Sequence, residues 1–405
     1  MRPALLAALA LLVSACTATA PPSAPPAVTL GPLKIGILVP FTESAIDADI
    51  GASQRRAADL YLKLRDGKLA GREVQLVYDD ESALDPATNS VRIEQFLDRD
   101  HVELLMGGVS AAAATLLRDA SEKAKLIYLD TNASANSLSR GARSRFVFRV
   151  APSSWQLGEP LGEWAAKNGQ KDVFVVNADD AFGTETAAAF VDGLAKGGGA
   201  ASGRRAVPEK GGADWKKVVA EVRAQPAKSV FASLVTDDAE GFLLAWDAAG
   251  MRAAGYRLIG PGPLADGDVL KATKQAGLGV TTTSPWSAEL ENAANAAFVS
   301  AFEKAYQDED THQPLVPDGY AAEMWDAMAV LEHALADTKG DVRNAEALVA
   351  AIEKVSFDGP GGPVRFDPAT HARTEDVYVR EVRQAGGRLV QAIVDKIPSV
   401  KDPSQ

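Results

Sequence analysis

Six short segments carry the side chains best suited to hold a small polar solute. Each joins hydroxyl, amide or carboxylate groups to glycine or another small residue. Glycine lets a ligand approach the backbone, and the unpaired N–H groups at a helix start attract an anion such as a carboxylate. The segments are PFTES (40–44), GGVSAA (107–112), DTNAS (130–134), ADDAFG (178–183), VTDDAE (235–240) and GPGPLADG (260–267).

Segment 107–112 is a good candidate cradle for a solute carboxylate. Gly108 permits close approach of the backbone, and Ser110 can offer its hydroxyl where a helix begins at Ala111. The alternative is that Ser110 only caps this helix, because serine is a preferred N-cap residue. The segment alone favours neither role over the other.

The chain shows no motif of a catalytic centre. It has no G-x-S-x-G nucleophile elbow, no P-loop and no HExxH zinc motif. Acidic pairs such as Asp79 with Asp80 are adjacent, and adjacent residues of a strand point to opposite faces. They cannot flank a substrate as the two carboxylates of a glycosidase do. We therefore expect a binding protein and not an enzyme.

Composition argues against nucleic acid, metal and cofactor. The formal net charge is −12, whereas binding to nucleic acid requires a basic surface. The chain has one cysteine and four histidines, which lie far apart without the spacing of a metal site. We expect neither a metal nor a cofactor. The histidines are His101, His312, His333 and His371.

Short apolar runs alternate with longer amphipathic segments along the chain, which predicts strands alternating with helices. Helices are expected at 51–64, after Pro86, after Gly183, after Thr236, after Asp266, at 293–306 and at 320–336. Strands are expected at 33–39, 72–78, 101–106, 125–130, 146–150, 172–177, 229–235, 256–260, 377–382 and 388–394.

The same alternation predicts an α/β fold of two doubly wound parallel-sheet lobes. Most of the predicted strands are almost continuously apolar, as in parallel sheets that helices cover on both faces. About 375 residues fold, more than one core usually supports, so two lobes are expected. Ligands of such sheets bind beyond the carboxyl ends of the strands, where the six polar segments lie, three from each lobe.

The N-terminal region has the pattern of a lipoprotein signal. An apolar run in residues 1–15 is about half of the roughly 20 residues that a membrane-spanning helix needs. Val13, Ser14 and Ala15 precede Cys16 as in the bacterial lipobox, which predicts a lipidated cysteine and a Pro-rich tether over 16–27. The alternative is an ordinary cleaved signal in which Cys16 is incidental.

The folded chain resembles the type I periplasmic substrate-binding proteins of ABC importers, the Leu/Ile/Val-binding group. The likeness covers residues 33–382 and rests on the order and spacing of several segments together. These are LKIGILVPFTES, VYDDESALDPATNSVRIEQFLDRD, LLMGGVSAAAATLL, VFRVAPSSWQLG, VVNADDAFGTE and VRFDP.

The resemblance implies a clamshell whose lobes are joined by three crossings and close on a small solute. It implies that the protein is a monomer that meets the subunits of an ABC permease. One crossing falls near 150–152. The other boundaries are an N-terminal lobe of 28–150 plus 285–355, a C-terminal lobe of 151–280 plus 361–395, crossings at 281–284 and 356–360, and a tail of 396–405.

The resemblance also implies where a solute binds. In amino-acid-binding members, loops that match Ser110 and 130–132 hold the α-carboxylate and α-ammonium, and an acid of the second lobe completes the ammonium site. Here Gly262 stands in place of that acid, so Asp130 or Glu43 would have to supply the charge. The alternative for Asp130 is a turn-forming role. The candidate ligand residues are Thr42, Glu43, Ser44, Gly108, Ser110, Ala111, Asp130, Thr131, Asn132, Trp155, Phe182, Thr236 and Gly262.

Trp155 and Phe182 are the candidate apolar walls of this cleft, although either could belong to a core instead. The expected function is a lipid-anchored receptor in the bacterial cell envelope, facing the periplasm or the exterior. It would deliver an amino acid, such as a branched-chain one, or a related carboxylate or amide, to a permease. The alternatives are a lipoprotein that regulates a cell-wall enzyme and a sensor of ligand occupancy.

Overall fold

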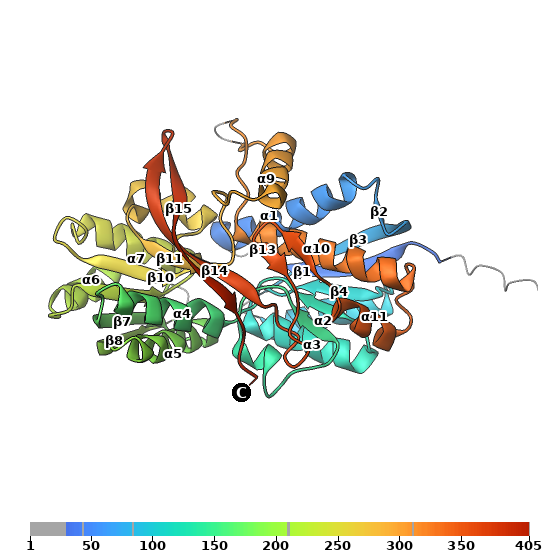
Figure 1. The fold of residues 1–405 in the computed structure, drawn as a ribbon, viewed down its shortest axis with the longest axis horizontal. Helices are drawn as coiled ribbons and strands as arrows, with labels where there is room; N and C mark the ends of the chain where they lie inside the picture. The colour runs from blue at the N-terminus through green and yellow to red at the C-terminus, as the bar shows by residue number, and fades with distance from the viewer. Residues whose placement is uncertain (1–29, 43, 83–84, 209–210, 310–311, 405) are drawn as a thin grey trace, which may run out of the picture.

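The computed structural model describes residues 30–42, 44–82, 85–208, 211–309 and 312–404. Two lobes lie side by side, each built around its own β-sheet (Figure 1). The predicted fold class, two doubly wound α/β lobes, is confirmed. The predicted signal peptide, Cys16 and Glu43 lie outside the described residues.

The first sheet has the strand order β2-β3-β1-β4-β5-β6, and only β2 runs antiparallel to its neighbour. β1 is apolar on both faces, since Ile35 and Ile37 enter one core while Leu38 enters the core on the other side. Its strands are β1 (Leu33–Val39), β2 (Lys68–Leu69), β3 (Arg72–Asp80), β4 (Leu104–Gly107), β5 (Tyr128–Asp130) and β6 (Val147–Arg149).

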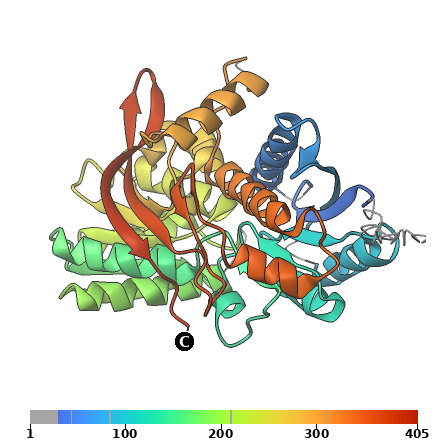
Figure 2. The ribbon, with the colours of Figure 1, turned by 45° about the vertical axis from the view of Figure 1, so that its right-hand side comes forward.

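Helices cover both faces of the first sheet. Those of one face come from distant parts of the chain, and in Figure 2 the late helices α10 and α11 lie beside the early elements of the lobe. One face carries α1 (Ala45–Lys63), α9 (Ala293–Ala305), α10 (Gly319–Thr338) and α11 (Ala345–Ile352). The other carries α2 (Pro86–Asp98), α3 (Ala111–Ala124) and the short helix η1 (Asn136–Ser139).

The second sheet has the order β15-β14-β11-β10-β9-β7-β8, in which β14 and β15 are antiparallel to their neighbours. Its first strands are β7 (Asp172–Ala178), β8 (Ala200–Val207), β9 (Ser229–Ser233), β10 (Arg257–Pro261) and β11 (Thr281–Ser284), followed late in the chain by β14 (Glu375–Ala385) and β15 (Arg388–Val400). One face carries α4 (Ser154–Lys167) and α5 (Ala181–Lys196), and the other α6 (Trp215–Arg223), α7 (Thr236–Ala248), η2 (Gly262–Ala265), α8 (Gly267–Thr273) and η3 (Lys274–Gly277).

The chain passes between the lobes three times, first just after β6 and again after β11. The predicted crossing at 281–284 is instead β11, a strand of the second sheet that pairs with β10 and β14. Its sequence, TTTS, contains three β-branched residues, which favour a strand, whereas the crossing at this place was expected from the family resemblance. The crossing follows Ser284.

The third passage also lies later than predicted. Residues 357–364 form a hairpin of β12 (Phe357–Gly359) and β13 (Gly362–Val364), and Gly362 adopts a φ of +107° in its tight turn. Val364 and Phe366 are buried in the core of the first lobe. The Gly/Pro-rich segment therefore packs on the first lobe, and the chain enters the second sheet only at β14.

The predicted tail at 396–405 is wrong over most of its described length. β15 continues to Val400, and Asp402 is only 4% exposed. β15 lies at the edge of the sheet, where Pro398 is tolerated within a strand. The β14–β15 ribbon runs between the lobes and brings the C-terminus beneath their junction (Figures 1 and 2).

Candidate functional site

The polar segments predicted from the sequence follow the carboxyl ends of β1, β4 and β5 in the first lobe and of β7, β9 and β10 in the second. The lobes are in contact at this end. Ile46, in the first turn of α1, is 6% exposed and packs in the second-lobe core with Leu234 and Leu264. The lobes therefore touch each other through α1 at this end.

The loop before α3 is held by a carboxylate of the protein itself. Gly107 has a φ of +98°, and a Cβ there would lie 2.2 Å from the Leu38 carbonyl oxygen. Val109 and Ser110 donate their N–H groups to the Glu81 carboxylate at 2.6 and 2.7 Å. Glu81 is 1% exposed, so it fills the part of the cradle that the sequence suggested for a solute carboxylate.

Ser110 itself caps α3, because its Oγ accepts a hydrogen bond from the Ala113 N–H at 3.1 Å. Ser110 and Ala111 remain half-buried, and Gly108, with a φ of +80°, is buried. Sequence reasoning missed Glu81. The available signal was its place directly after β3, where a carboxylate can reach the start of a neighbouring helix.

Asp130 is fully buried and serves its own loop. Its Oδ1 accepts the N–H groups of Asn132 and Ala133 at 3.2 and 2.9 Å. Its Oδ2 accepts from Arg149 Nε at 3.2 Å. Burial raises the pKa of Asp130 to about 6, and the Arg149 charge opposes that rise. The geometry corresponds to the turn-forming alternative. Because the carboxylate is fully buried among these partners, a solute ammonium group does not reach it.

Thr131 and Asn132 differ in how far their side chains are exposed. Thr131 is fully buried and donates its Oγ1–H to Gln54 Oε1 at 2.9 Å. Asn132 is half-buried, and its side-chain amide lies near Glu323 of α10, where it opposes the rise in the pKa of that carboxyl group. Of the candidates on this loop, Asn132 therefore keeps the most accessible surface.

The candidate ligand residues after β1 form hydrogen bonds with neighbouring residues of the protein. Thr42 is exposed and donates its hydroxyl hydrogen to Asp80, which also accepts the Phe41 N–H at 2.6 Å. Ser44 is the N-cap of α1 and accepts from the Asp47 N–H at 3.1 Å.

The second-lobe candidates lie at the starts of α4, α5, α7 and η2. Trp155 and Phe182 are half-buried, so neither is a core residue, and Lys196 Nζ lies 5.7 Å from the Trp155 ring centroid. Thr236 begins α7 with a φ of +47°. Gly262 is buried.

An arginine of β14 occupies the surroundings of Gly262. A Cβ at Gly262 would lie 3.2 Å from Arg380 Nη2, so a guanidinium fills the space that an acidic side chain here would enter. Arg380 is fully buried and donates from Nη1 to the Trp286 carbonyl at 2.8 Å. Its ion-pair partner, Asp266, lies 3.7 Å away. Sequence reasoning missed Arg380 because the two residues are far apart in the chain.

Several carboxylates surround this arginine, but burial opposes their ionisation. Burial, then Glu375 and Asp266, raise the pKa of Glu323 well above its usual value. Burial and neighbouring carboxylates, led by Asp318, raise the pKa of Asp268 to about 9. Near neutral pH Asp268 therefore holds its proton, and burial likewise favours the protonated form of Glu323.

A cavity of about 760 Å³ opens between α1, α8, α9 and the β14–β15 ribbon. Asp49, Asp268, Lys271 and Asp318 lie in its wall. None of the described residues predicted to bind a solute lines it. The structure thus places that cavity beside the predicted cleft residues and not among them.

The described part of the chain shows no sign of a metal centre or a membrane span. Nowhere in it do three or more histidine, cysteine or acidic side chains form a group able to hold a metal ion. No helix there is both long enough and apolar enough to cross a membrane.

The profile of the periplasmic binding protein family matches residues 32–388, and the chain belongs to that family. The two-lobe fold and the relatives place it among the type I members of the Leu/Ile/Val-binding group. One relative, Leu/Ile/Val-binding protein homolog 6 of Brucella suis biovar 1 (strain 1330), is 26% identical over 87% of this chain and 88% of its own.

Solved structures agree with this assignment. A solute binding protein of an ABC transporter from Rhodopseudomonas palustris BisB5, in complex with 3,4-dihydroxy benzoic acid, is 26% identical with a TM-score of 0.84, covering 92% of this chain and 98% of that one. A second R. palustris protein, in complex with benzoate, is 28% identical with a TM-score of 0.83 over 92% and 99% of the two chains. Proteins of this family and fold bind solutes for transporters outside the cytoplasm and are not enzymes.

Proposed function

We propose that this protein is the extracytoplasmic receptor of an ABC importer for a small organic carboxylate that lacks an α-ammonium group. The observation that carries the proposal is the Arg380 guanidinium beside Gly262, where a receptor for amino acids would have an acid. An ammonium group here would be repelled by the arginine. A carboxylate would be attracted to it.

The rest of the cleft is consistent with such a solute. Asp130 is engaged by Arg149 and its own turn, so the first lobe offers no free carboxylate at that position. Burial favours the neutral form of Glu323, which does not repel a carboxylate and has an O–H group to donate. Trp155 and Phe182 supply half-buried aromatic surface for an apolar body.

The solved relatives support the same class of solute. The two R. palustris proteins were solved with benzoate and with a dihydroxybenzoic acid, and both compounds carry a carboxylate without an ammonium group. The benzoates support an aromatic solute, and the likeness to a Leu/Ile/Val-binding protein homologue supports a branched aliphatic one. We therefore propose a carboxylate of one of these two kinds.

A matched pair of solutes tests the proposal. Calorimetry should show that α-ketoisocaproate and benzoate bind at least about tenfold more tightly than leucine, a difference of about 1.4 kcal/mol. Gly262→Glu should pair with Arg380 and weaken both carboxylates. Gly262→Ser, which adds no charge, is the control. Tighter binding of leucine than of its keto acid to the wild-type protein would refute the assigned class.

We also propose that Cys16 carries a lipid and that residues 16–27 tether the receptor to a membrane, where it meets the permease as a monomer. The V-S-A-C sequence and the Pro-rich segment support this. Mass spectrometry of the mature protein should find an acylated N-terminal Cys16, and Cys16→Ala should abolish acylation. An unmodified N-terminus beyond Cys16 would contradict the anchor.

A further inference from the structure

Asp402, a buried carboxylate near the C-terminus, forms hydrogen bonds with residues of both lobes. Asp402 follows β15 of the second sheet and is 4% exposed. Its Oδ1 accepts from Ser153 Oγ at 2.6 Å, and Ser153 is the N-cap of α4 in the second lobe. Asp402 also accepts from Ser139 Oγ and lies 3.1 Å from Arg140 Nη2, both in the first lobe.

The contact with Ser139 continues into the first lobe. Arg149 donates from Nη1 to Ser139 Oγ at 2.9 Å. Since a guanidinium has no acceptor, the Ser139 hydroxyl must accept from Arg149, and its own hydrogen is left for Asp402. The direction of both hydrogen bonds is therefore fixed.

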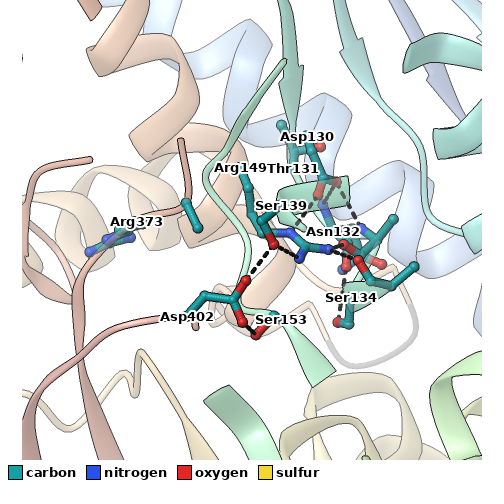
Figure 3. Close-up of polar contacts among 12 residues, drawn as sticks. Asp130, Thr131, Asn132, Ser134, Ser139, Arg149, Ser153, Arg373 and Asp402 are labelled. Atoms are coloured by element: carbon teal, nitrogen blue, oxygen red, sulfur yellow. Dashed lines mark hydrogen bonds and ion pairs between the residues drawn. The ribbon is translucent and has the colours of Figure 1, made fainter. Parts of the chain in front are cut away.

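Arg149 in turn organises the cleft loop. Its Nη2 donates to the carbonyls of Ala133 and Ala135 at 2.8 and 2.6 Å, and its Nε donates to Asp130. Asp130 holds the N–H groups of Asn132 and Ala133. Figure 3 shows this series of contacts running from Asp402 through Ser139 and Arg149 to the loop that carries Asn132.

We propose that Asp402 is a positioning residue for the solute cleft: through Ser139 and Arg149 it sets the conformation of the loop 130–135. The inference rests on the proposed function only for the role of that loop in binding. Because buried hydrogen bonds to charged groups are among the stronger ones, removing the carboxylate should loosen the loop.

Hydrogen exchange on the solute-free protein tests this without knowing the ligand. Asp402→Asn should speed exchange of the amides of Asn132 and Ala133 by about tenfold, because the isosteric amide cannot replace a charged acceptor. Asp376→Asn is the matched control. Asp376 is also a buried carboxylate of the β14–β15 ribbon, but it bonds Ser399 N and Lys396 within that ribbon.

A second variant separates positioning from a general loss of stability. Ser139→Ala breaks the series of contacts but leaves Asp402 bonded to Ser153, so it should loosen the loop even if Asp402→Asn folds poorly. Exchange should rise at 132–135 and stay near wild-type values in α5 and α7. Uniformly faster exchange, or equal effects of Asp402→Asn and Asp376→Asn on the loop, would overturn the proposal. If the loop loosens while benzoate does not bind, only the proposed solute class fails.

Discussion

The two faces of the cleft differ in how their polar groups are satisfied. On the first-lobe face, Glu81, Asp130 and Thr131 are buried and bonded to neighbouring backbone or side chains. On the second-lobe side, Arg380 Nε beside Gly262 and Asp268 Oδ2 in the wall of the neighbouring cavity are buried without a hydrogen-bond partner among the described residues. The loops after β3 and β5 are thus paired within the protein, whereas buried polar atoms without partners among the described residues remain on the second-lobe side and at Glu323 of α10.

This difference suggests that the two lobes contribute differently to binding. Loops whose polar groups are already paired lose little freedom when they bind, which favours affinity. Buried groups without partners cost free energy until something satisfies them. We therefore expect the first-lobe loops to be preformed and the second-lobe side to contribute more to the choice of solute.

The largest expected effect comes from breaking the contacts of the first-lobe loops. Arg149→Met leaves the Asp130 carboxylate buried without its cation, which should lower the free energy of unfolding by about 3–5 kcal/mol. Urea unfolding measures the loss. Arg145→Met is the control, since Arg145 pairs with Glu346 on the surface, where a salt bridge contributes at most about 1 kcal/mol. Equal losses would mean that the buried pair is no more important than an exposed one.

Glu81 should rank second. Glu81→Gln keeps the shape but removes the charge that accepts two N–H groups at the start of α3, so we expect a loss of about 1.5–3 kcal/mol in the same assay. Asp119→Asn, an exposed acid on the same helix, should change stability by less than about 0.5 kcal/mol. No difference between the variants would argue that the α3 start is solvated and not preformed.

On the second-lobe side, replacing the buried acid Asp268 should raise stability instead of lowering it. Because the folded state raises the pKa of Asp268 to about 9, stability is greatest below its ordinary pKa near 4 and falls as pH rises toward 9. Asp268→Asn removes this loss. Its melting temperature should exceed that of wild type by about 2–4 °C per kcal/mol relieved at pH 8, and the difference should vanish at pH 4. A melting temperature below wild type at pH 8 would contradict the assignment.

The smallest effect is expected at Asp237, which is exposed in the first turn of α7. α7 has no side-chain N-cap bond, so Asp237 can stabilise it only through the helix dipole. Asp237→Asn should cost about 0.3–1 kcal/mol at low salt and less in 1 M salt, measured by urea unfolding. A larger cost that persists in salt would show that this face also contains a preformed element.

The alternating strands and helices of the two lobes could be predicted from the sequence. The continuously apolar strands and the helices between them were recognisable because parallel strands are buried on both faces. β8 and α6 were missed, since β8 alternates half-buried with exposed residues at the edge of its sheet and α6 is short. Residues 281–284 were missed as a strand because they are polar and the family resemblance suggested a crossing there.

The candidate site was harder to predict because its decisive contacts join distant parts of the chain. Loops after strands could be located from local pattern alone. The engagement of Asp130 by Arg149, the carboxylate of Glu81 at α3 and the guanidinium beside Gly262 depend on tertiary packing. A single sequence contains no periodicity that reports such pairs.

The outermost strand of the second sheet has a consequence for how copies of the protein behave in a crowded compartment. β15 is 13 residues long and lies at the edge of its sheet, so its unpaired backbone groups could serve as a template for a strand of another molecule. Pro398 removes one donor from this edge, and the exposed neighbours Asp395 and Lys396 place charges along it. These residues protect a long β-edge from self-association into aggregates.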